Sequence, residues 1–477
     1  AELKFTIMVL LRDTVSAAGR WGRWLVHGLG DEVALNVVRR RPAIRGAPVV
    51  GRCAPSDDGD ATSSSSDAVG RIEHKPHAQG GGVAVVTGAT SGVGAATAQL
   101  LADRGYEVLV GGRNATKARA VAAGIGPAAT AIEVDLGSTR AALESARRVA
   151  RHAKSCAAAR QNARDTNDKG GVAVLVNNAA GTGGSRAATL RVNLLATAAF
   201  TCAVLPELAR VNGVVVNVGS SSHLRASRVE LSTVAADDRR DADLRAYAQS
   251  KLGLMHFSRV LDAAGVVAVD AHPGLCWTAM LQAQLGPRVV GVLEGHRAGR
   301  WLRARLFKDP DEGAATVVAA VLAGTKLAAE PTAALSQHDD DKSSSSSSSS
   351  PAPTTKALGR GQRYVVHARV QPPTGRRASP ESRAPAAIRL TWRSVLHPHL
   401  VDAAGAAAGG RGGCVGADSE EDTDDARTAP DGDDDDASSP TFRDTLRRLD
   451  EACERAFPPP PVPSTADPVV GSKGSFI

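Results

Sequence analysis

Residues 81–105 read GGVAVVTGATSGVGAATAQLLADRG, a short apolar strand followed by a glycine-rich turn and an alanine-rich helix. A phosphate group approaches a backbone closely only where no β-carbon intrudes, and the N-terminus of a helix favours its negative charge. The order of strand, turn and helix therefore predicts a site for the phosphates of a dinucleotide. The candidate cofactor residues in this turn are Gly88, Thr90, Ser91, Gly92, Val93 and Gly94.

Short valine-rich runs alternate with helical stretches on both sides of this turn. Continuous apolar strands separated by helices indicate a parallel sheet covered on both faces. Right-handed crossovers then predict a doubly wound, Rossmann-type α/β fold that binds ligands at the carboxyl ends of its strands. The expected strands are Val83–Thr87, Glu107–Val110, Ala131–Val134, Val172–Val176, Gly213–Val218 and Val266–Ala271. GQRYVVHARV (361–370) predicts one further strand, and TFRDTLRRLDEACERAF (441–457) an amphipathic helix.

Low-complexity runs interrupt the later part of the chain, and we expect a single domain with long insertions rather than two domains. The predicted parts are an N-terminal extension and linker (1–80), a Rossmann core (81–330), a Ser-rich disordered insertion (331–356), the C-terminal strand and helix of the core (357–457) with a Gly-rich and acidic insertion (403–438), and a Pro-rich tail (458–477).

Composition narrows the classes of function. The formal charge of +7 hides eleven acids and one arginine in residues 418–436, so the rest of the chain sums to about +17. A basic body suits a phosphate-bearing cofactor or an anionic surface, and we expect no nucleic-acid partner because no reading motif accompanies it. The six cysteines include no CxxC pair, which predicts neither a metal site nor a disulfide framework and fits a reducing compartment.

The N-terminal 52 residues carry Lys4 and eight arginines against four acids, with Trp21 and Trp24 among them. Three interpretations stay open for this segment: an organelle-targeting sequence such as a mitochondrial one, a peripheral membrane helix, or an N-terminal extension. The expected location is accordingly cytoplasmic, peripheral to a membrane, or mitochondrial.

AYAQSKLGLMHF (246–257) places a tyrosine and a lysine four residues apart, on one face of a helix. A free tyrosine has a pKa of about 10, and a neighbouring positive charge stabilises its phenolate. Tyr247 and Lys251 are therefore candidates for a proton-transferring group, with Tyr247 as the general acid or base.

The glycine-rich turn, LVNNAAG (175–181), NVGS (217–220), the Tyr247–Lys251 pair and HPGLCWT (272–278) together resemble the short-chain dehydrogenase/reductase family. The resemblance covers about residues 82–323 and implies a nicotinamide-dependent oxidoreductase. It assigns the substrate oxygen to Ser220, with Ser221 and Ser222 as alternatives by proximity, and the nicotinamide ribose to Lys251. Asn193 resembles the asparagine of a helix kink that holds a water molecule near the lysine. His223 and His272 are more readily structural than catalytic.

The same resemblance implies further cofactor contacts. Asp135 and the adjacent Leu136 match the adenine position, Asn177 and Ala179 the adenosine ribose, and Pro273, Gly274 and Thr278 the nicotinamide segment. The second strand ends without the acid that binds the ribose 2′-hydroxyl of NAD. Arg113 stands there instead, and its guanidinium suits a 2′-phosphate, so we predict NADP(H).

The interval of 27 residues between Ser220 and Tyr247 and the stretch YAQSKLGLMHFSRVL resemble the retinol-dehydrogenase-like branch. That branch implies a small apolar alcohol or carbonyl as substrate. A rival interpretation is a weakly active structural subunit of a larger assembly that retains NADP, to which the long insertions and bulky Trp277 beside Thr278 point. Homo-oligomers through surface helices also fit the resemblance.

Overall fold

The computed structural model describes residues 82–162, 170–182, 185–230, 240–329, 364–366, 369–371, 384–408 and 440–459. The N-terminal segment, the serine run and the acidic stretch lie outside these residues. The expectations about targeting, membrane contact and disorder in those segments, like the domain boundaries, stay predictions.

A single sheet forms the centre of the described structure, and its strand order is β3-β2-β1-β4-β5-β6-β7-β8. All neighbouring pairs are parallel except the last, β7 with β8. The order reverses between β1 and β4, which is where a doubly wound sheet forms its ligand crevice. The strands are β1 (Val83–Thr87), β2 (Glu107–Gly112), β3 (Ala129–Glu133), β4 (Val172–Asn177), β5 (Val214–Val218), β6 (Val267–His272), β7 (Tyr364–Val366) and β8 (Arg369–Gln371).

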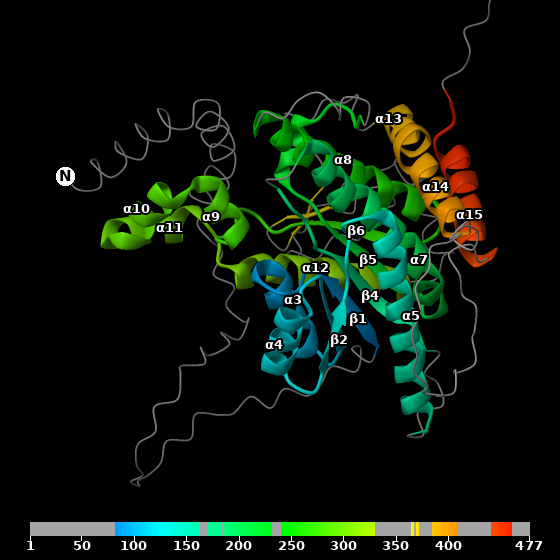
Figure 1. The fold of residues 1–477 in the computed structure, drawn as a ribbon, viewed down its shortest axis with the longest axis horizontal. Helices are drawn as coiled ribbons and strands as arrows, with labels where there is room; N and C mark the ends of the chain where they lie inside the picture. Colours follow the sequence, from blue (N-terminus) through cyan, green and yellow to red (C-terminus); the bar gives the residue numbers. More distant parts are fainter. Residues whose placement is uncertain are drawn as a thin grey trace, which may run out of the picture.

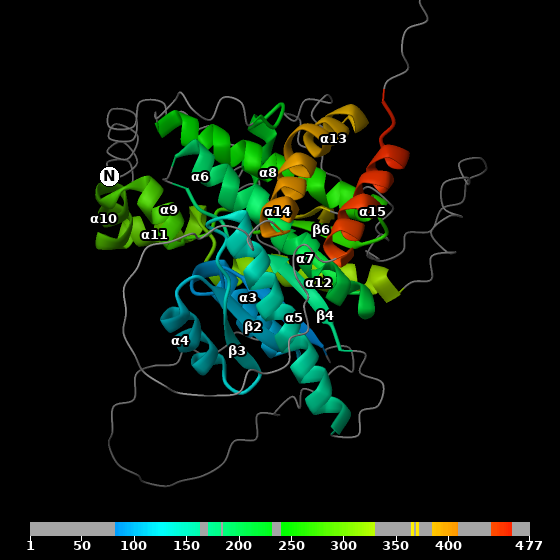
Figure 2. The ribbon, with the colours of Figure 1, turned by 45° about the vertical axis from the view of Figure 1, so that its right-hand side comes forward.

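Helices cover both faces of this sheet, as the continuous apolar strands predict (Figures 1 and 2). One face carries α3 (Gly92–Ala102), α4 (Ala115–Ile125) and α12 (Pro310–Ala329). The other carries α5 (Thr139–Asn162), α7 (Thr197–Arg210) and α8 (Arg240–Ala263). The remaining helical elements are α6 (Arg186–Leu190), η2 (Arg191–Ala196), η3 (Ser221–Arg225), α9 (Ala279–Leu285), α10 (Pro287–Gly295), α11 (Arg297–Leu306), α13 (Pro385–Thr391), η6 (Trp392–Leu396), α14 (His397–Ala408) and α15 (Pro440–Ala456).

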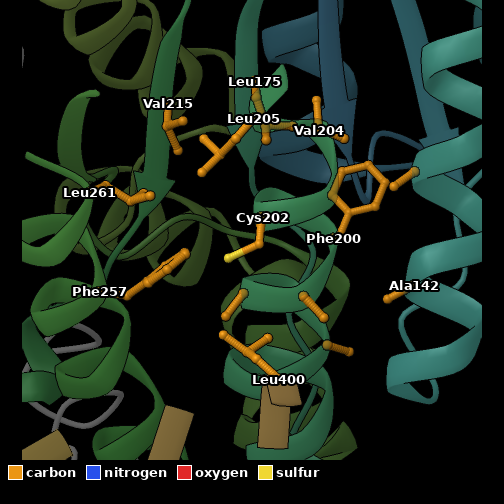
Figure 3. Packing of buried hydrophobic residues seen from close by; sticks show 14 of the residues in the cluster. Ala142, Leu175, Phe200, Cys202, Val204, Leu205, Val215, Phe257, Leu261 and Leu400 are labelled. Carbon is orange, nitrogen blue, oxygen red and sulfur yellow. The ribbon is translucent and has the colours of Figure 1, made fainter. Parts of the chain in front are cut away.

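Aliphatic side chains fill the core on each face, and large aromatic residues are few. On the α7 face, the Cys202 sulfur of α7 points towards Phe257 of α8, and the Phe200 ring points towards α5 (Figure 3). Because valine and alanine are short, the helices lie close to the sheet, and glycine is required where they approach most closely. A Cβ on Gly324 of α12 would lie 2.4 Å from a methyl group of Val214 in β5.

The last two strands differ from the sequence prediction. Residues 361–370 were predicted to form one strand, whereas the structure has two strands of three residues, and β8 turns back antiparallel to β7. The pattern YVVHARV has no break that would mark this reversal, so the local sequence alone does not reveal it. The predicted helix at 441–457 is confirmed as α15.

The C-terminal helices extend the core of the α7 face. Trp392 of η6 is fully buried, and its indole Nε1 donates to Asp450 of α15 at 2.9 Å. Phe442, Leu446 and Leu449 of α15 belong to the same apolar cluster as the side chains beneath α7 and α8. These helices therefore cover outer parts of α7 and α8, which Figure 2 shows on the right of the molecule.

Two helical stretches, Arg186–Ala209 and Pro310–Ala329, have the length and apolar composition of a membrane span. Buried helices of α/β proteins meet the same criteria, and both stretches pack against the sheet here. About 78% of the apolar window of the first stretch and 50% of the second is buried within the fold.

Candidate functional site

The glycine-rich turn joins β1 to α3 at the carboxyl edge of the sheet, and Asn178 holds it there. The Asn178 amide Nδ2 donates to the carbonyl oxygens of Thr87 and Gly88 at 3.0 and 3.2 Å. In return, the hydroxyl of Thr87 accepts the backbone N–H groups of Asn178 and Ala179 at 3.1 and 3.0 Å. The predicted NNAA segment therefore lies beside the turn, and Asn178 is a site residue that the sequence argument passed over in favour of its neighbour Asn177.

Two glycines of this turn are required by its own packing. A Cβ on Gly94 would lie 2.3 Å from Asn178 Nδ2 and 2.4 Å from the Gly88 carbonyl oxygen. Gly88 has φ of +65°, which an L-residue adopts with strain, and its Cβ would lie 2.8 Å from Ala179 Cα. We expected glycine here for the approach of a phosphate, and the structure adds closure of the turn onto the NNAA segment as a second reason.

Tyr247 and Lys251 follow one another on α8 and face the end of β5. The Lys251 ammonium donates to the Val218 carbonyl oxygen at 2.7 Å and lies 5.6 Å from the centre of the Tyr247 ring. The Tyr247 hydroxyl is hydrogen-bonded to the side chain of Ser220. The fold thus brings together three of the four residues predicted to be catalytic.

Burial dominates the proton affinities of this group. It raises the pKa of Tyr247, although the hydrogen bond with Ser220 opposes the rise. Burial also lowers the pKa of Lys251 to about 8, because the protein interior disfavours the ammonium. From the sequence, the Lys251 charge is predicted to lower the pKa of the tyrosine. The net direction is upward instead, and the phenol therefore holds its proton at neutral pH.

Asn193, the fourth predicted catalytic residue, lies in the π-helical segment η2 between α6 and α7. Its side chain closes two hydrogen bonds with the Gly181 backbone, accepting at 2.8 Å and donating at 3.0 Å. Its Nδ2 also lies 3.4 Å from Ser250 Oγ, and Ser250 in turn donates to the Tyr247 carbonyl oxygen at 2.8 Å. The predicted irregular helix is present, and Asn193 connects it to α8 through Ser250. The predicted water link stays a prediction.

The Ser220 loop is held by its neighbours. Ser222 donates its backbone N–H to Ser220 Oγ at 3.2 Å, and the two hydroxyl oxygens lie 3.1 Å apart. His223 Nδ1 lies 2.6 Å from the Ser220 carbonyl oxygen. Ser222 and His223 are thus placed to orient Ser220, in keeping with the structural role expected of this histidine.

On the cofactor side, Arg113 follows β2 directly and is exposed. The side chain of Thr90 reaches over the end of that strand, since a Cβ on Gly112 would meet Thr90 Cγ2 at 2.3 Å. Arg113 is therefore adjacent in space to the glycine-rich turn. Asp135 accepts the backbone N–H of Gly137 at 2.9 Å, which shapes the loop after β3.

The side chains of three predicted cofactor residues pack against, or are hydrogen-bonded to, the interior of the protein. Leu136 is buried in the apolar core, and Val93 packs towards Gly313 of α12. Asn177 is 2% exposed, and its Nδ2 donates to Thr201 and Asn217, both at 2.8 Å. The Asn177 side chain is thus part of the interior of the α7 face.

The HPGLCWT segment reaches the glycine-rich turn from the far side. A Cβ on Gly92 would meet the Thr278 methyl group at 3.2 Å, and the Thr278 hydroxyl caps the N-terminus of α9 by accepting the Leu281 N–H. Lys308 is a residue that the sequence argument missed. Its ammonium donates to the Pro273 carbonyl oxygen at 3.1 Å, and its backbone bonds to Leu275 and Trp277. The end of α11 is therefore tied to the predicted nicotinamide segment.

The described residues also include one set of three potential metal ligands, at the opposite end of the sheet. Glu107 Oε1 accepts from the Cys156 thiol at 2.7 Å and lies 3.3 Å from His152 Nε2. The sequence prediction of no metal site rested on the absence of a CxxC pair, a pattern that does not detect this mixed set. The cluster is internally hydrogen-bonded and lies away from Tyr247.

An α/β fold with a glycine-rich turn and a Ser–Tyr–Lys group at the carboxyl edge defines a dinucleotide-dependent oxidoreductase. Residues 82–286 match the profile of the short chain dehydrogenase family. Polyprenol dehydrogenase of Mus musculus is 34% identical over 265 residues, which cover 51% of this chain and 72% of that protein. The chain belongs to the short-chain dehydrogenase family.

Solved structures give a weaker likeness. One described as a short chain dehydrogenase/reductase family protein is 24% identical, with a TM-score of 0.35, over 50% of this chain and 88% of the other. The KRED1-Pglu enzyme is 20% identical, with a TM-score of 0.37, over 51% of this chain and 95% of the other. At these scores the likeness supports no inference, and family membership rests on the sequence matches.

Proposed function

We propose that the chain is an NADP(H)-dependent oxidoreductase that interconverts an alcohol with an aldehyde or ketone on an apolar substrate. The observation that carries this proposal is the group of Ser220, Tyr247 and Lys251 at the same edge of the sheet as the glycine-rich turn. A bound nicotinamide would supply or accept the hydride. The protein's own groups then have to manage one proton and one developing charge on oxygen.

Tyr247 is the proposed proton donor in the direction of reduction. The phenol is protonated at neutral pH, and burial raises its pKa further, so a proton is in place for the oxygen of a carbonyl that receives a hydride. Ser220 is hydrogen-bonded to the same phenol, and its hydroxyl is suited to hold the substrate oxygen beside it. Lys251, held by the Val218 carbonyl oxygen, stabilises the phenolate that remains. In oxidation the proton moves the opposite way.

The choice of NADP over NAD rests on Arg113. An acidic residue after β2 would bind the two ribose hydroxyls of NAD and repel a 2′-phosphate. Arg113 occupies that place, exposed and next to Thr90 at the glycine-rich turn. A guanidinium pairs well with a phosphate dianion, and this supports NADP(H) as the cofactor.

A long isoprenoid alcohol is the first substrate to test. The relative in Mus musculus is named polyprenol dehydrogenase, and the alignment covers 72% of it. The helices after Thr278, where we expect the substrate, carry their own apolar cluster of Trp277, Leu281, Leu293 and Phe307. Trp277 is 7% exposed and packs on Phe307 with ring centres 5.1 Å apart. Its bulk thus lies within that cluster, which weakens one argument for a non-catalytic subunit.

Titration with NADPH and NADH, followed by turnover of the bound cofactor with isoprenoid and other apolar aldehydes, tests the proposal. We expect preferential binding of NADPH and aldehyde-dependent oxidation of it. Tyr247→Phe serves as the matched control, because it removes one hydroxyl and leaves the ring in place. Binding of NADPH without turnover of any carbonyl would favour the structural subunit, and binding of neither nucleotide would overturn the cofactor assignment.

A further inference from the structure

Helices α9, α10 and α11 form a small lobe that projects from the side of the sheet, on the left in Figure 1. The lobe follows directly after Thr278 and returns to the sheet at Lys308, whose backbone bonds to Leu275 and Trp277. It is therefore connected at both ends to the predicted nicotinamide segment. Any surface that binds this lobe lies next to the proposed active site.

The lobe carries a concentrated positive charge. Residues 279–308 contain five arginines and one lysine against a single acid, Glu294. The Glu294 carboxylate accepts the indole N–H of Trp277 at 2.9 Å. Among the described residues, the carboxylate paired with an arginine of this lobe is Asp309, at 3.8 Å from Arg303. The five arginines of the lobe therefore outnumber the carboxylates that pair with them among the described residues.

Helix α11 presents much of this charge on one face, together with a tryptophan. Arg297, Arg300, Trp301 and Arg305 are exposed at helical spacing, and we call these four residues the α11 face. Residues on the opposite side, including Leu302 and Leu306, pack into the lobe. Trp301 is 49% exposed, and the Arg305 guanidinium lies 5.0 Å from its ring centre.

We propose that the α11 face docks on an anionic phospholipid surface and holds the active site against the membrane. Arginines at the headgroup level gain energy from anionic lipids, and a tryptophan with its apolar ring and N–H favours the same interfacial depth. In water, the exposed Trp301 ring has no contact comparable to the one that a lipid headgroup region offers. A nucleic-acid surface would match the charge equally well, but a lone indole on a helix supplies no set of stacking or base-reading groups.

The link to catalysis rests on the proposed function. A long isoprenoid alcohol is insoluble in water and resides in bilayers, so an enzyme acting on it must meet the substrate at the lipid surface. The lobe begins at Thr278, beside the glycine-rich turn, and ends at Lys308, which bonds to Pro273. Docking of the α11 face therefore brings this segment close to the lipid.

Flotation of the full-length protein with phosphatidylcholine vesicles, with and without phosphatidylserine, tests the docking. We expect binding only to the anionic vesicles and loss of binding at high salt. Each cation near such a surface contributes about fivefold to partition, so Arg297→Glu combined with Arg305→Glu should lower the partition coefficient at least about 25-fold. Trp301→Ala, which removes an exposed side chain, should lower it without any change of charge.

A matched control carries the same charge change elsewhere. Arg151→Glu with Arg443→Glu alters exposed residues of α5 and α15, and we expect it to retain most of the binding. An equal loss in this control, or no binding by the unaltered protein, would overturn the docking. Binding that emerges only when residues 418–436 are deleted would also overturn it. That result would mean that the α11 face binds the chain's own acidic stretch rather than a lipid surface.

Activity separates this inference from the proposed function. The α11 variants should oxidise a short, water-soluble isoprenoid alcohol as fast as the unaltered protein and lose turnover of a long one embedded in vesicles. Equal turnover of both alcohols in all variants, with unchanged flotation, would refute the docking alone. Flotation that depends on the α11 face, without turnover of any alcohol, would refute the proposed function and leave the docking intact.

Discussion

The two faces of the sheet are built differently, although the same strands form both. The face under α3, α4 and α12 is packed with apolar side chains such as Val86, Val176, Val216 and Val269. The face under α5, α7 and α8 is apolar only towards the amino ends of the strands. Nearer the carboxyl ends it carries a row of buried polar side chains, one from each of four neighbouring strands. They are Thr87, Asn177, Asn217 and Asp270.

Hydrogen bonds connect this row across the sheet and into the helices. Asn177 Nδ2 donates to Asn217 Oδ1 at 2.8 Å, and Asn217 Nδ2 donates to Ser258 Oγ at 2.8 Å. Ser258 of α8 then donates to Asp270 Oδ1 at 2.6 Å. Buried polar groups are costly unless they are paired, so the row holds α8 at a particular position along the strands.

This difference shows which face of the sheet supports each half of the candidate site. The apolar face supports α3, whose first turn belongs to the predicted phosphate site, and α4, which follows Arg113, and apolar packing places both helices. The polar face supports α8 and η2, which carry Tyr247, Lys251 and Asn193. Proton transfer requires side chains held within a few tenths of an ångström, and directional hydrogen bonds supply that precision better than apolar contacts do.

The largest effect is expected from a single hydroxyl on the polar face. Tyr247→Phe removes the proton donor while the ring still fills its place, so turnover should fall about 10²- to 10⁴-fold. Cofactor affinity and the free energy of unfolding should change little. Steady-state kinetics with a fluorescence titration of NADPH measure both, and retained turnover would remove Tyr247 from the mechanism.

The second-largest effect is expected at Arg113, beside the predicted cofactor site on the apolar face. Arg113→Asp replaces the proposed phosphate ligand by a repelling carboxylate, and a charge-assisted hydrogen bond contributes about 1.5–3 kcal/mol. The ratio of the NADPH and NADH dissociation constants should therefore shift at least about tenfold towards NADH. Arg119→Asp, on the exposed side of α4, is the control with the same charge change. An unchanged ratio in Arg113→Asp would be evidence against the 2′-phosphate assignment.

Tight packing on the apolar face predicts that alanine substitution at two helical glycines changes the free energy of unfolding in opposite directions. Gly324→Ala forces a methyl group against Val214 and should lower the free energy of unfolding by about 1–3 kcal/mol. Gly124→Ala on α4 meets nothing within 4 Å and should raise it by about 0.5–1 kcal/mol. Denaturant titration compares the two variants. Similar effects in both would mean that α12 has room to move away from the sheet.

The last effect is a slope with pH and concerns the polar row. Burial raises the pKa of Asp270 to about 7, although Arg259 and Ser258 oppose the rise. A carboxyl whose pKa is raised on folding stabilises the protein at low pH, and this contribution is lost as pH rises towards 7. Asp270→Asn should therefore gain stability relative to the unaltered protein from pH 5 to 7, by at most about 1.4 kcal/mol per pH unit. Parallel unfolding free energies across that range would show that Asp270 titrates normally.

Short-range patterns were enough to predict most of the fold. Each of the six valine-rich runs is a strand in the structure, within three residues at either end, and the stretch at 81–105 is β1, the turn and α3. These elements are specified by residues within one or two turns of each other, through strand length, glycine spacing and apolar continuity. The Tyr247–Lys251 pair was predictable for the same reason, since both residues lie on adjacent turns of one helix.

Other features depend on residues that meet only in the folded protein. Asn177 and Asn178 are adjacent and chemically identical, yet one braces the turn and the other enters the polar row, because successive side chains leave a strand on opposite faces. The direction of the Tyr247 pKa likewise follows from burial, which sequence spacing does not report.

The position of each strand along the chain, the glycine-rich turn and the pairing of Tyr247 with Lys251 on one helix are properties of local sequence, because neighbours along the chain supply the contacts that specify them. The polar row, the return of β8 along β7, the connection of Lys308 to the nicotinamide segment and the projecting α11 face are tertiary properties. They depend on packing between segments tens of residues apart, and the free energy of those contacts exists only once the sheet has assembled.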